Sequence, residues 1–223
     1  MKLVLFDCDG TLVDSAGLIH EVMVLTFEAF GKTPPSFDGT KSIIGLTLDI
    51  AIARLDGKPH ADDEAVAMMA YYKQIFADVR GSGNSTERPY DGVAEVIAGL
   101  SERDEVLVGA VTGKSRRGLD LILDSNGWRH HFHVGRTADD CPSKPHPAMV
   151  TECCDEMGVN ASDTVVIGDA VYDMQMARAA GARAIGVAWG YATVPELVEA
   201  GAHAIARTPA DLMALIFQED VHA

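Results

Sequence analysis

Short apolar runs recur along this chain, and most are followed by a stretch of helical periodicity. Side chains of a strand alternate between its two faces, so a strand that is apolar throughout is buried on both. Apolar strands that alternate with helices predict an α/β fold, with a Rossmann-like parallel sheet between two layers of helices. The expected strands are residues 3–6, 106–111, 132–134, 164–167, 184–188 and 203–206. The expected helices between and after them are residues 115–126, 147–157, 172–180, 195–200 and 209–217.

One connection is far too long for this alternation of strands and helices. About 97 positions separate Asp9 from Val106, whereas a crossover between parallel strands needs only about a dozen residues. Helical patterns fill most of this stretch, at residues 18–30, 47–55, 62–79 and 91–103. We therefore expect an α-helical cap domain of residues 16–84, inserted into a core domain of residues 1–15 and 85–223. Its two hinges are expected at residues 14–17 and 81–85.

The charge balance limits the kinds of partner. The chain has 18 basic and 33 acidic residues, which gives a formal net charge of −15. Nucleic acid and anionic membranes select basic surfaces, so neither is expected as a partner. A small phosphorylated metabolite is still possible, because it responds to local charge in a cleft. We expect the protein to be a monomer or a homodimer.

Cellular location is inferred from the absence of sorting signals. The first residues enter a strand directly, without a basic segment and an apolar leader. No apolar stretch approaches the roughly 18 residues that a membrane-spanning helix needs, so a cytoplasmic protein is expected. The cysteines are too few and too irregular for a disulfide framework; they are Cys8, Cys141, Cys153 and Cys154.

Polar residues follow the expected strands at their carboxyl ends, the edge at which open α/β sheets bind ligands. Asp7 and Asp9 flank Cys8, so in extended chain both carboxylates should point the same way. Their mutual repulsion requires compensation, which a divalent cation and a lysine would supply. Oxygen ligands in a site with few protein ligands favour Mg²⁺. The full set at the strand ends is Asp7, Asp9, Thr112, Gly113, Lys144, Asp169 and Asp173.

These residue types suit transfer of a phosphoryl group. Asp7 at the strand end can act as nucleophile and form an aspartyl phosphate. Asp9 can protonate the leaving oxygen and later deprotonate water. The Thr112 hydroxyl and Gly113 amide would hold the phosphoryl oxygens, and Lys144 would stabilise charge on Asp7 and the phosphoryl group. The sequence thus predicts a Mg²⁺-dependent phosphatase.

The segments "DCDGTLVDS", "TGK", "KP" and "GDAVYD" resemble, in order and spacing, the four motifs of the haloacid dehalogenase superfamily. Residues 186–205 are similar to the tail of its phosphoglycolate phosphatase-like branch, which carries a helical cap. The resemblance implies a small substrate like phosphoglycolate, with Asp7 as nucleophile and metal ligand. It further implies that Asp9 ligates through its backbone carbonyl, that Asp169 is the third ligand and that Asp173 supports the metal through water.

The sequence departs from this family pattern at two positions. Ala170 stands where a serine is common, which removes one possible hydroxyl near the metal. Gly113 stands where asparagine is frequent, so the phosphate would have only a backbone donor there. Neither departure removes a residue of the expected chemistry.

Two other functions are weighed against a phosphatase. A phosphosugar mutase of the same fold would carry a histidine and a Trp-Lys pair on its first cap helix, but here His20 is out of register and the pair is missing. A phosphorylatable signalling domain would also combine Asp, Thr and Lys, but Asp9 and the large cap oppose it, because a switch must not hydrolyse quickly. The cap is expected to select the substrate, with Gly45 approaching the leaving group.

A cluster of histidines at His130, His131 and His133 lacks the spacing of a metal site. We expect these histidines to be surface or strand residues.

Overall fold

A computed structural model describes residues 1–82 and 87–218 of the chain. Its centre is a six-stranded parallel sheet in the order β5-β4-β1-β6-β7-β8, as the alternation of apolar runs and helices predicted. The strands are β1 (Lys2–Phe6), β4 (Val106–Val111), β5 (Val134–Arg136), β6 (Thr164–Gly168), β7 (Arg183–Val187) and β8 (Ala204–Ala206). The first strand lies between β4 and β6, so the residues that follow β1 enter the middle of the ligand edge.

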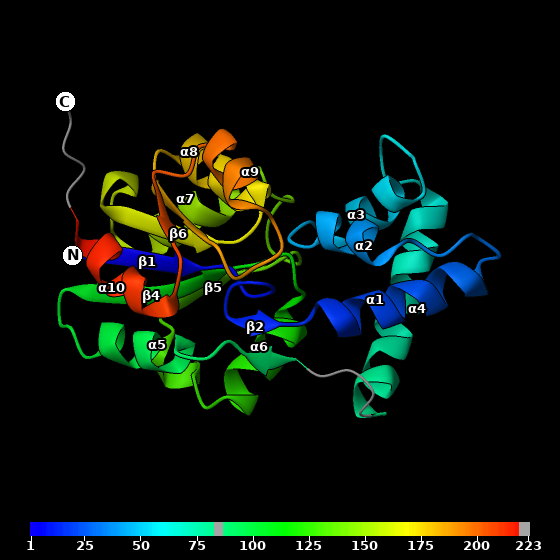
Figure 1. Cartoon of the computed structure of the whole chain (residues 1–223), viewed down its shortest axis with the longest axis horizontal. Helices are drawn as coiled ribbons and strands as arrows, with labels where there is room; N and C mark the ends of the chain where they lie inside the picture. Colours follow the sequence, from blue (N-terminus) through cyan, green and yellow to red (C-terminus); the bar gives the residue numbers. More distant parts are fainter. Residues whose placement is uncertain (83–86, 219–223) are drawn as a thin grey trace.

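Helices cover both faces of the sheet (Figure 1). Leu3 and Leu5 of β1 pack toward α7, α8 and α9, whereas Val4 and Phe6 pack toward α5, α6 and α10. All four of these side chains are at most 1% exposed, and burying each contributes about 1.5–3 kcal/mol. The helices are α5 (Val93–Ser101), α6 (Arg116–Ser125), α7 (Ala148–Met157), α8 (Val171–Ala180), α9 (Val194–Glu199) and α10 (Pro209–Phe217).

Within the described residues, four helices lie between β2 (Val13–Asp14) and β3 (Arg88–Pro89) in the chain, and they are placed beyond the ligand edge of the sheet (Figure 1). We call them the helical insertion: α1 (Ala16–Ala29), α2 (Phe37–Ile43), α3 (Leu48–Leu55) and α4 (Asp63–Gly81). They pack around an apolar cluster of their own, which includes Phe27, Ile52 and Met68. The excess length that the sequence shows before Val106 is therefore a separate helical layer.

Two features of this region are not among the sequence predictions, although Ser36 is of a type that commonly begins a helix. Helix α2 is only seven residues long and follows two prolines, and its start depends on the Ser36 hydroxyl, which accepts the Gly39 N–H. A two-residue ladder joins β2 (Val13–Asp14) to β3 (Arg88–Pro89), where the chain leaves and re-enters the core. The expected boundary at residues 84 and 85 lies outside the described residues, as does most of the second expected hinge.

Two expectations about the whole chain can be compared with the structure. None of the helices in the described ranges is both long and apolar enough to cross a membrane. All four cysteines are buried and free, in agreement with the absence of a disulfide framework.

Candidate active site

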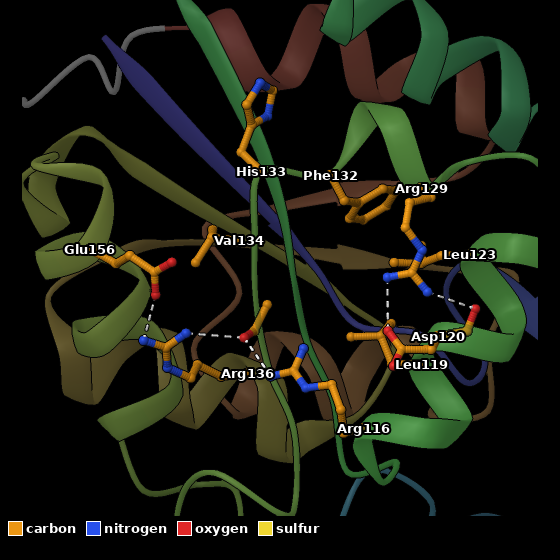
Figure 2. A pocket seen from close by; sticks show the side chains of 11 residues that line it. Arg116, Leu119, Asp120, Leu123, Arg129, Phe132, His133, Val134, Arg136 and Glu156 are labelled. Atoms are coloured by element: carbon orange, nitrogen blue, oxygen red, sulfur yellow. Dashed lines mark hydrogen bonds and ion pairs between the residues drawn. The ribbon is translucent and has the colours of Figure 1, made fainter.

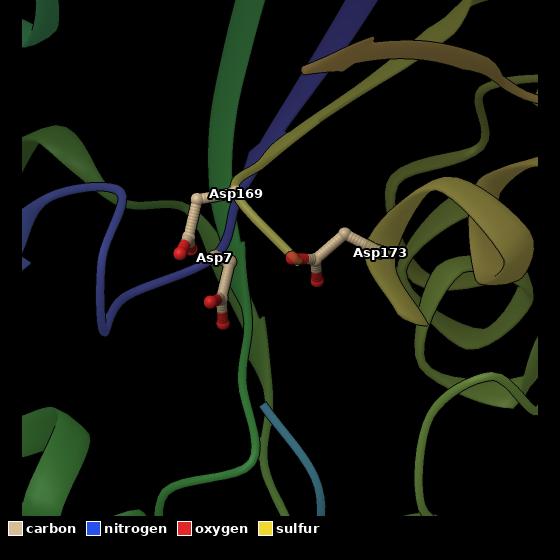
Figure 3. Close-up of side chains that lie close together, drawn as sticks. All are labelled: Asp7, Asp169 and Asp173. Carbon is tan, nitrogen blue, oxygen red and sulfur yellow. The ribbon is translucent and has the colours of Figure 1, made fainter. Parts of the chain in front are cut away.

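Three carboxylates converge where β1 and β6 end. Asp7 directly follows β1, Asp169 directly follows β6, and Asp173 lies in the first turn of α8. One oxygen from each lies within 4.8 Å of the others, and all three residues are at most 1% exposed (Figure 3). Gly168 permits this approach, because a β-carbon there would lie 2.3 Å from Cγ of Asp173. The fold thus places carboxylates from two neighbouring strands in one buried cluster.

A single lysine bridges this cluster. Lys144, in the loop before α7, donates from Nζ to Oδ1 of Asp7 at 2.7 Å and to Oδ1 of Asp173 at 2.6 Å. Burial opposes its charge, but Asp173 and Asp7 outweigh burial and raise the pKa of the ammonium. The other oxygen of Asp173 accepts the Ala170 N–H at 3.0 Å. Asp173 therefore holds Lys144 in place and also begins α8.

The carboxylates carry more negative charge than Lys144 balances. Burial raises the pKa of Asp7 to about 7, against the opposing effect of Lys144 and together with the effects of Asp173 and Asp9. Burial, with Asp7 and Asp173 nearby, also raises the pKa of Asp169 well above its usual range. Oδ2 of Asp7 is buried and accepts no hydrogen bond from any described residue. An oxygen-only donor set with excess charge and one unsatisfied oxygen fits a divalent cation.

Asp9 lies outside this cluster and has charge partners of its own. Its Oδ1 accepts from the Ser15 hydroxyl and from Nζ of Lys114, the latter at 2.9 Å. Lys114 also pairs with Glu87 at 2.7 Å. The sequence predicted that a divalent cation and a lysine would offset the repulsion between Asp7 and Asp9; in the structure each aspartate has its own lysine, Lys144 for Asp7 and Lys114 for Asp9. The Asp9 carboxylate therefore keeps a separate, partly accessible position, with the residue 7% exposed.

Asp169 is oriented by groups that the sequence analysis did not single out. Oδ1 accepts the Thr11 hydroxyl at 3.0 Å, and Oδ2 accepts the Tyr191 amide at 2.9 Å. Two glycines pack against this carboxylate: a β-carbon at Gly10 would lie 2.2 Å from Oδ2, and one at Gly190 would lie 2.1 Å from Cβ. Gly10 also has a φ of 85°, which favours glycine. The motif glycine and the loop after β7 thus clamp Asp169 between them.

The expected phosphate-binding residues lie at the end of β4, beneath the helical insertion. Thr112 is 1% exposed, and its hydroxyl accepts the Lys114 N–H at 3.2 Å. A β-carbon at Gly113 would lie 2.6 Å from the Leu46 carbonyl oxygen and 2.7 Å from that of Gly45. The insertion loop therefore sits directly over this position, which explains why a glycine stands here in place of a larger residue. Gly45, expected near the leaving group, lies against the same edge of the core.

The histidine cluster has ordinary structural partners. The His130 and His131 rings lie 3.8 Å apart, and Nδ1 of His131 is 2.6 Å from the Ser101 hydroxyl. Nδ1 of His133 accepts the Val108 N–H at 3.3 Å. Within residues 1–82 and 87–218, the three-residue group able to hold a metal is Asp7, Asp169 and Asp173, without a histidine. These contacts agree with the expectation of surface or strand histidines.

A pocket of about 300 Å³ lies along β5 and α6 (Figure 2). Its arginines are already paired: Arg129 with Asp120 at 2.9 Å and Arg136 with Glu156 at 2.7 Å. Arg116 likewise pairs with a neighbouring aspartate. None of the clustered carboxylates lines this pocket, so it is separate from the candidate active site.

Comparison with known sequences shows what the whole chain is similar to. The family model described as haloacid dehalogenase-like hydrolase matches residues 4–187. "Probable phosphatase IndB" from Dickeya dadantii is 30% identical over 207 residues, which cover 92% of this chain and 89% of that protein. A phosphoglycolate phosphatase from Xylella fastidiosa is 31% identical, and the match covers 85% of this chain and 81% of the relative.

Comparison with solved structures supports the fold. The crystal structure of a hydrolase from Pseudomonas syringae superimposes with a TM-score of 0.84 at 22% identity. The match covers 97% of this chain and 98% of that chain. Both the sheet and the helical insertion are therefore part of the shared architecture.

Proposed function

The chain belongs to the haloacid dehalogenase-like hydrolases, and from this premise we propose that it is a Mg²⁺-dependent phosphatase acting on a small phosphorylated metabolite such as phosphoglycolate. One observation carries the proposal: the buried Asp7 accepts a hydrogen bond from Lys144, lies beside Asp169 and retains one oxygen that has no partner among the described residues. A carboxylate in these surroundings suits attack on phosphorus. The substrate class is supported by the names of relatives, several of which are phosphoglycolate phosphatases.

The residues that would hold the metal are Asp7 and Asp169 through their carboxylates and Asp9 through its backbone carbonyl. Asp173 would support the metal through water, while its two oxygens hold Lys144 and the Ala170 N–H. When bound, the cation would neutralise the carboxylates and polarise the phosphoryl group.

The first half of the proposed reaction transfers the phosphoryl group to the protein. An Asp7 oxygen attacks phosphorus, the bond from phosphorus to the ester oxygen breaks, and an aspartyl phosphate forms. The departing oxygen takes a proton from the Asp9 carboxyl. Lys144, fixed by Asp173, stabilises the negative charge between Asp7 and the phosphoryl oxygens. Thr112 can donate its hydroxyl proton to one of those oxygens, and Gly113 its amide.

The second half returns the protein to its starting state. Asp9, now ionised, takes a proton from a water molecule, and the oxygen of that water attacks phosphorus. The bond between phosphorus and the Asp7 oxygen breaks, which releases inorganic phosphate and restores the carboxylate. Lys114 and Ser15 hold Asp9 at the boundary with the helical insertion, where both the leaving group and the incoming water must arrive.

We further propose that the helical insertion acts as a cap of residues 16–84 on a core of residues 1–15 and 85–223. The Thr47 N–H donates to the Ser143 hydroxyl at 2.9 Å, and the Tyr172 hydroxyl donates to the Ser42 carbonyl at 3.1 Å. With these contacts in place Asp7 is only 1% exposed, so substrate entry requires the cap to move. A site this enclosed favours a small substrate. Gly45 would lie near the leaving group of that substrate.

The experiment that tests this function is a screen of phosphate release in the presence of Mg²⁺. The panel contains phosphoglycolate, hexose phosphates, nucleotides and pyrophosphate. We expect release of inorganic phosphate, with the highest kcat/KM for a small phosphomonoester. Isomerised sugar phosphate without phosphate release would indicate a mutase, and a stable phosphoprotein without turnover would indicate a signalling domain. Either result would overturn the proposal.

Removing divalent ions is expected to abolish phosphate release, and restoring Mg²⁺ is expected to recover it. At Mg²⁺ concentrations about 100-fold above Kd, binding should stabilise the fold by about 2.7 kcal/mol. This corresponds to a rise of roughly 5–10 °C in the thermal midpoint for a chain of this size. Asp169→Asn should lose both effects, because it removes a ligand, whereas the exposed variant Asp155→Asn should keep them. Full activity in excess chelator would contradict the metal site.

A further inference from the structure

The first helix of the insertion is capped by a residue from the other end of the chain. The first N–H groups of a helix have no partner within it. At the start of α1, the Ser15 and Ala16 N–H groups both donate to the Tyr191 hydroxyl, each at 3.0 Å. The same hydroxyl donates to Asp14 at 3.2 Å. Tyr191 follows β7 and lies 176 positions from Ser15.

Serine at such a position usually caps the helix with its own hydroxyl. Two other helices of this chain show that arrangement: Ser36 accepts the Gly39 N–H, and Ser115 accepts the Gly118 N–H. Ser15 does not, because its side chain makes no capping bond to α1. Its fully buried hydroxyl donates to the Asp9 carboxylate instead. The Ser15 side chain is thus directed at Asp9, while the Ser15 backbone N–H is bound by Tyr191.

Tyr191 is also held by the carboxylate cluster of Asp7, Asp169 and Asp173. Its backbone amide donates to Asp169 at 2.9 Å, and its ring packs against the apolar cluster of the helical insertion. One residue therefore touches a proposed metal ligand with its main chain and the first hinge of the cap with its side chain.

We propose that Tyr191 is a positioning residue for Asp9: its phenol binds the Ser15 and Ala16 N–H groups and thereby holds the Ser15 backbone where the Ser15 hydroxyl reaches the Asp9 carboxyl. Without the phenol, the Ser15 N–H loses this acceptor, so the start of α1 is less fixed and the Ser15 hydroxyl is no longer held against Asp9. The inference extends the proposed phosphatase function, since it assigns the residue that keeps the proton donor in place.

The test uses Tyr191→Phe, which removes one oxygen and keeps the ring. We expect kcat to fall about tenfold, because misplaced proton transfer forfeits part of the roughly 10²–10⁴-fold that a general acid contributes. KM should stay within about twofold, since the phosphate-binding residues are unchanged. Tyr71→Phe is the matched control: it loses the same atom from a ring that packs edge-on against Phe30 in the insertion, and it should keep wild-type kinetics.

A double-mutant cycle separates positioning from a general structural role. If Tyr191 acts through Ser15, the double variant Tyr191→Phe/Ser15→Ala should have the kcat of Ser15→Ala alone, within about twofold. Losses in kcat that multiply, or a wild-type kcat in Tyr191→Phe, would overturn the inference.

Amide hydrogen exchange supplies a readout that needs no substrate. In Tyr191→Phe the Ser15 amide should exchange at least about tenfold faster than in the wild type, because it loses its acceptor, whereas the Ala16 amide keeps a longer bond to Oδ1 of Asp14 at 3.4 Å. Unchanged exchange rates would refute the capping role even if activity fell. If the wild-type protein released no phosphate from the panel, the proposed function would fail, and the exchange rates would still decide whether Tyr191 caps α1.

Discussion

Asp7→Asn is expected to abolish phosphate release, with kcat/KM reduced by at least about 10⁴-fold. The amide cannot form an acyl phosphate, and no other described carboxylate has both a lysine partner and a free buried oxygen. The stability of the metal-free protein, in contrast, should not fall in this variant. Asp7 is a buried carboxylate among other carboxylates, so its removal relieves repulsion in the absence of metal. Measured with a chelator present, the thermal midpoint of Asp7→Asn should equal or exceed that of the wild type.

The control for this variant is Asp104→Asn, which makes the same chemical change at an exposed position. It should leave both activity and the thermal midpoint at wild-type values. Substantial phosphate release by Asp7→Asn would exclude Asp7 as the nucleophile. A large loss of metal-free stability would show that the carboxylate is retained for folding.

Lys144→Met is the second change with a large expected effect, and it should reduce both activity and stability. The side chain of Lys144 is fully buried and pairs with two carboxylates. Removing one partner of a buried ion pair costs about 3–5 kcal/mol, which urea denaturation at pH 8 with chelator would measure. Phosphate release should fall by about 10²–10³-fold, because a fixed positive charge beside the transferred group is lost.

Lys73→Met is the matched control for this change. Lys73 lies in the insertion, its side chain is 48% exposed, and its nearest carboxylate oxygen, from Asp139, is 3.9 Å away. A surface pair of this kind contributes at most about 1 kcal/mol, so neither activity nor stability should change much. If Lys144→Met kept wild-type kcat, the lysine would be a structural counter-ion only.

The fold and the convergence of carboxylates at the strand ends could be predicted because both are encoded locally. A run such as residues 3–6 is apolar throughout, and the aspartates follow it directly, so strand and site occur in one short segment. Parallel topology then brings Asp7 and Asp169 together without further information, since β1 and β6 are neighbours and their ends share an edge.

The pairing of charges within the site could not be predicted in the same way. Lys114 stands in the "TGK" segment, but its contacts with Asp9 and Glu87 depend on how the insertion returns to the core. In the sequence, Asp173 is a carboxylate four residues after Asp169. Its hydrogen bond from Lys144 depends on how α8 packs against β6. Contacts of this kind join distant segments and leave no periodic trace in the sequence.

The capping of α1 is the clearest example of such a contact. Ser15 directly precedes α1, where a serine commonly caps the helix, yet its hydroxyl donates to Asp9. The Ser15 and Ala16 N–H groups are bound by Tyr191, a residue far away in the sequence. Positions at which a local expectation fails are often functional, and this one adjoins the proposed proton donor.

The most direct measurement of the central claim is to trap and locate the phosphoryl group. Asp9→Asn should still accept a phosphoryl group from a substrate with a good leaving group, but it should hydrolyse the aspartyl phosphate slowly. After incubation with substrate and Mg²⁺, acid quenching and digestion, mass spectrometry should find one phosphoryl group on the peptide that contains Asp7, at the Asp7 side chain. Phosphate release at the wild-type rate without any phosphorylated peptide, or a phosphoryl group on another residue, would contradict the account.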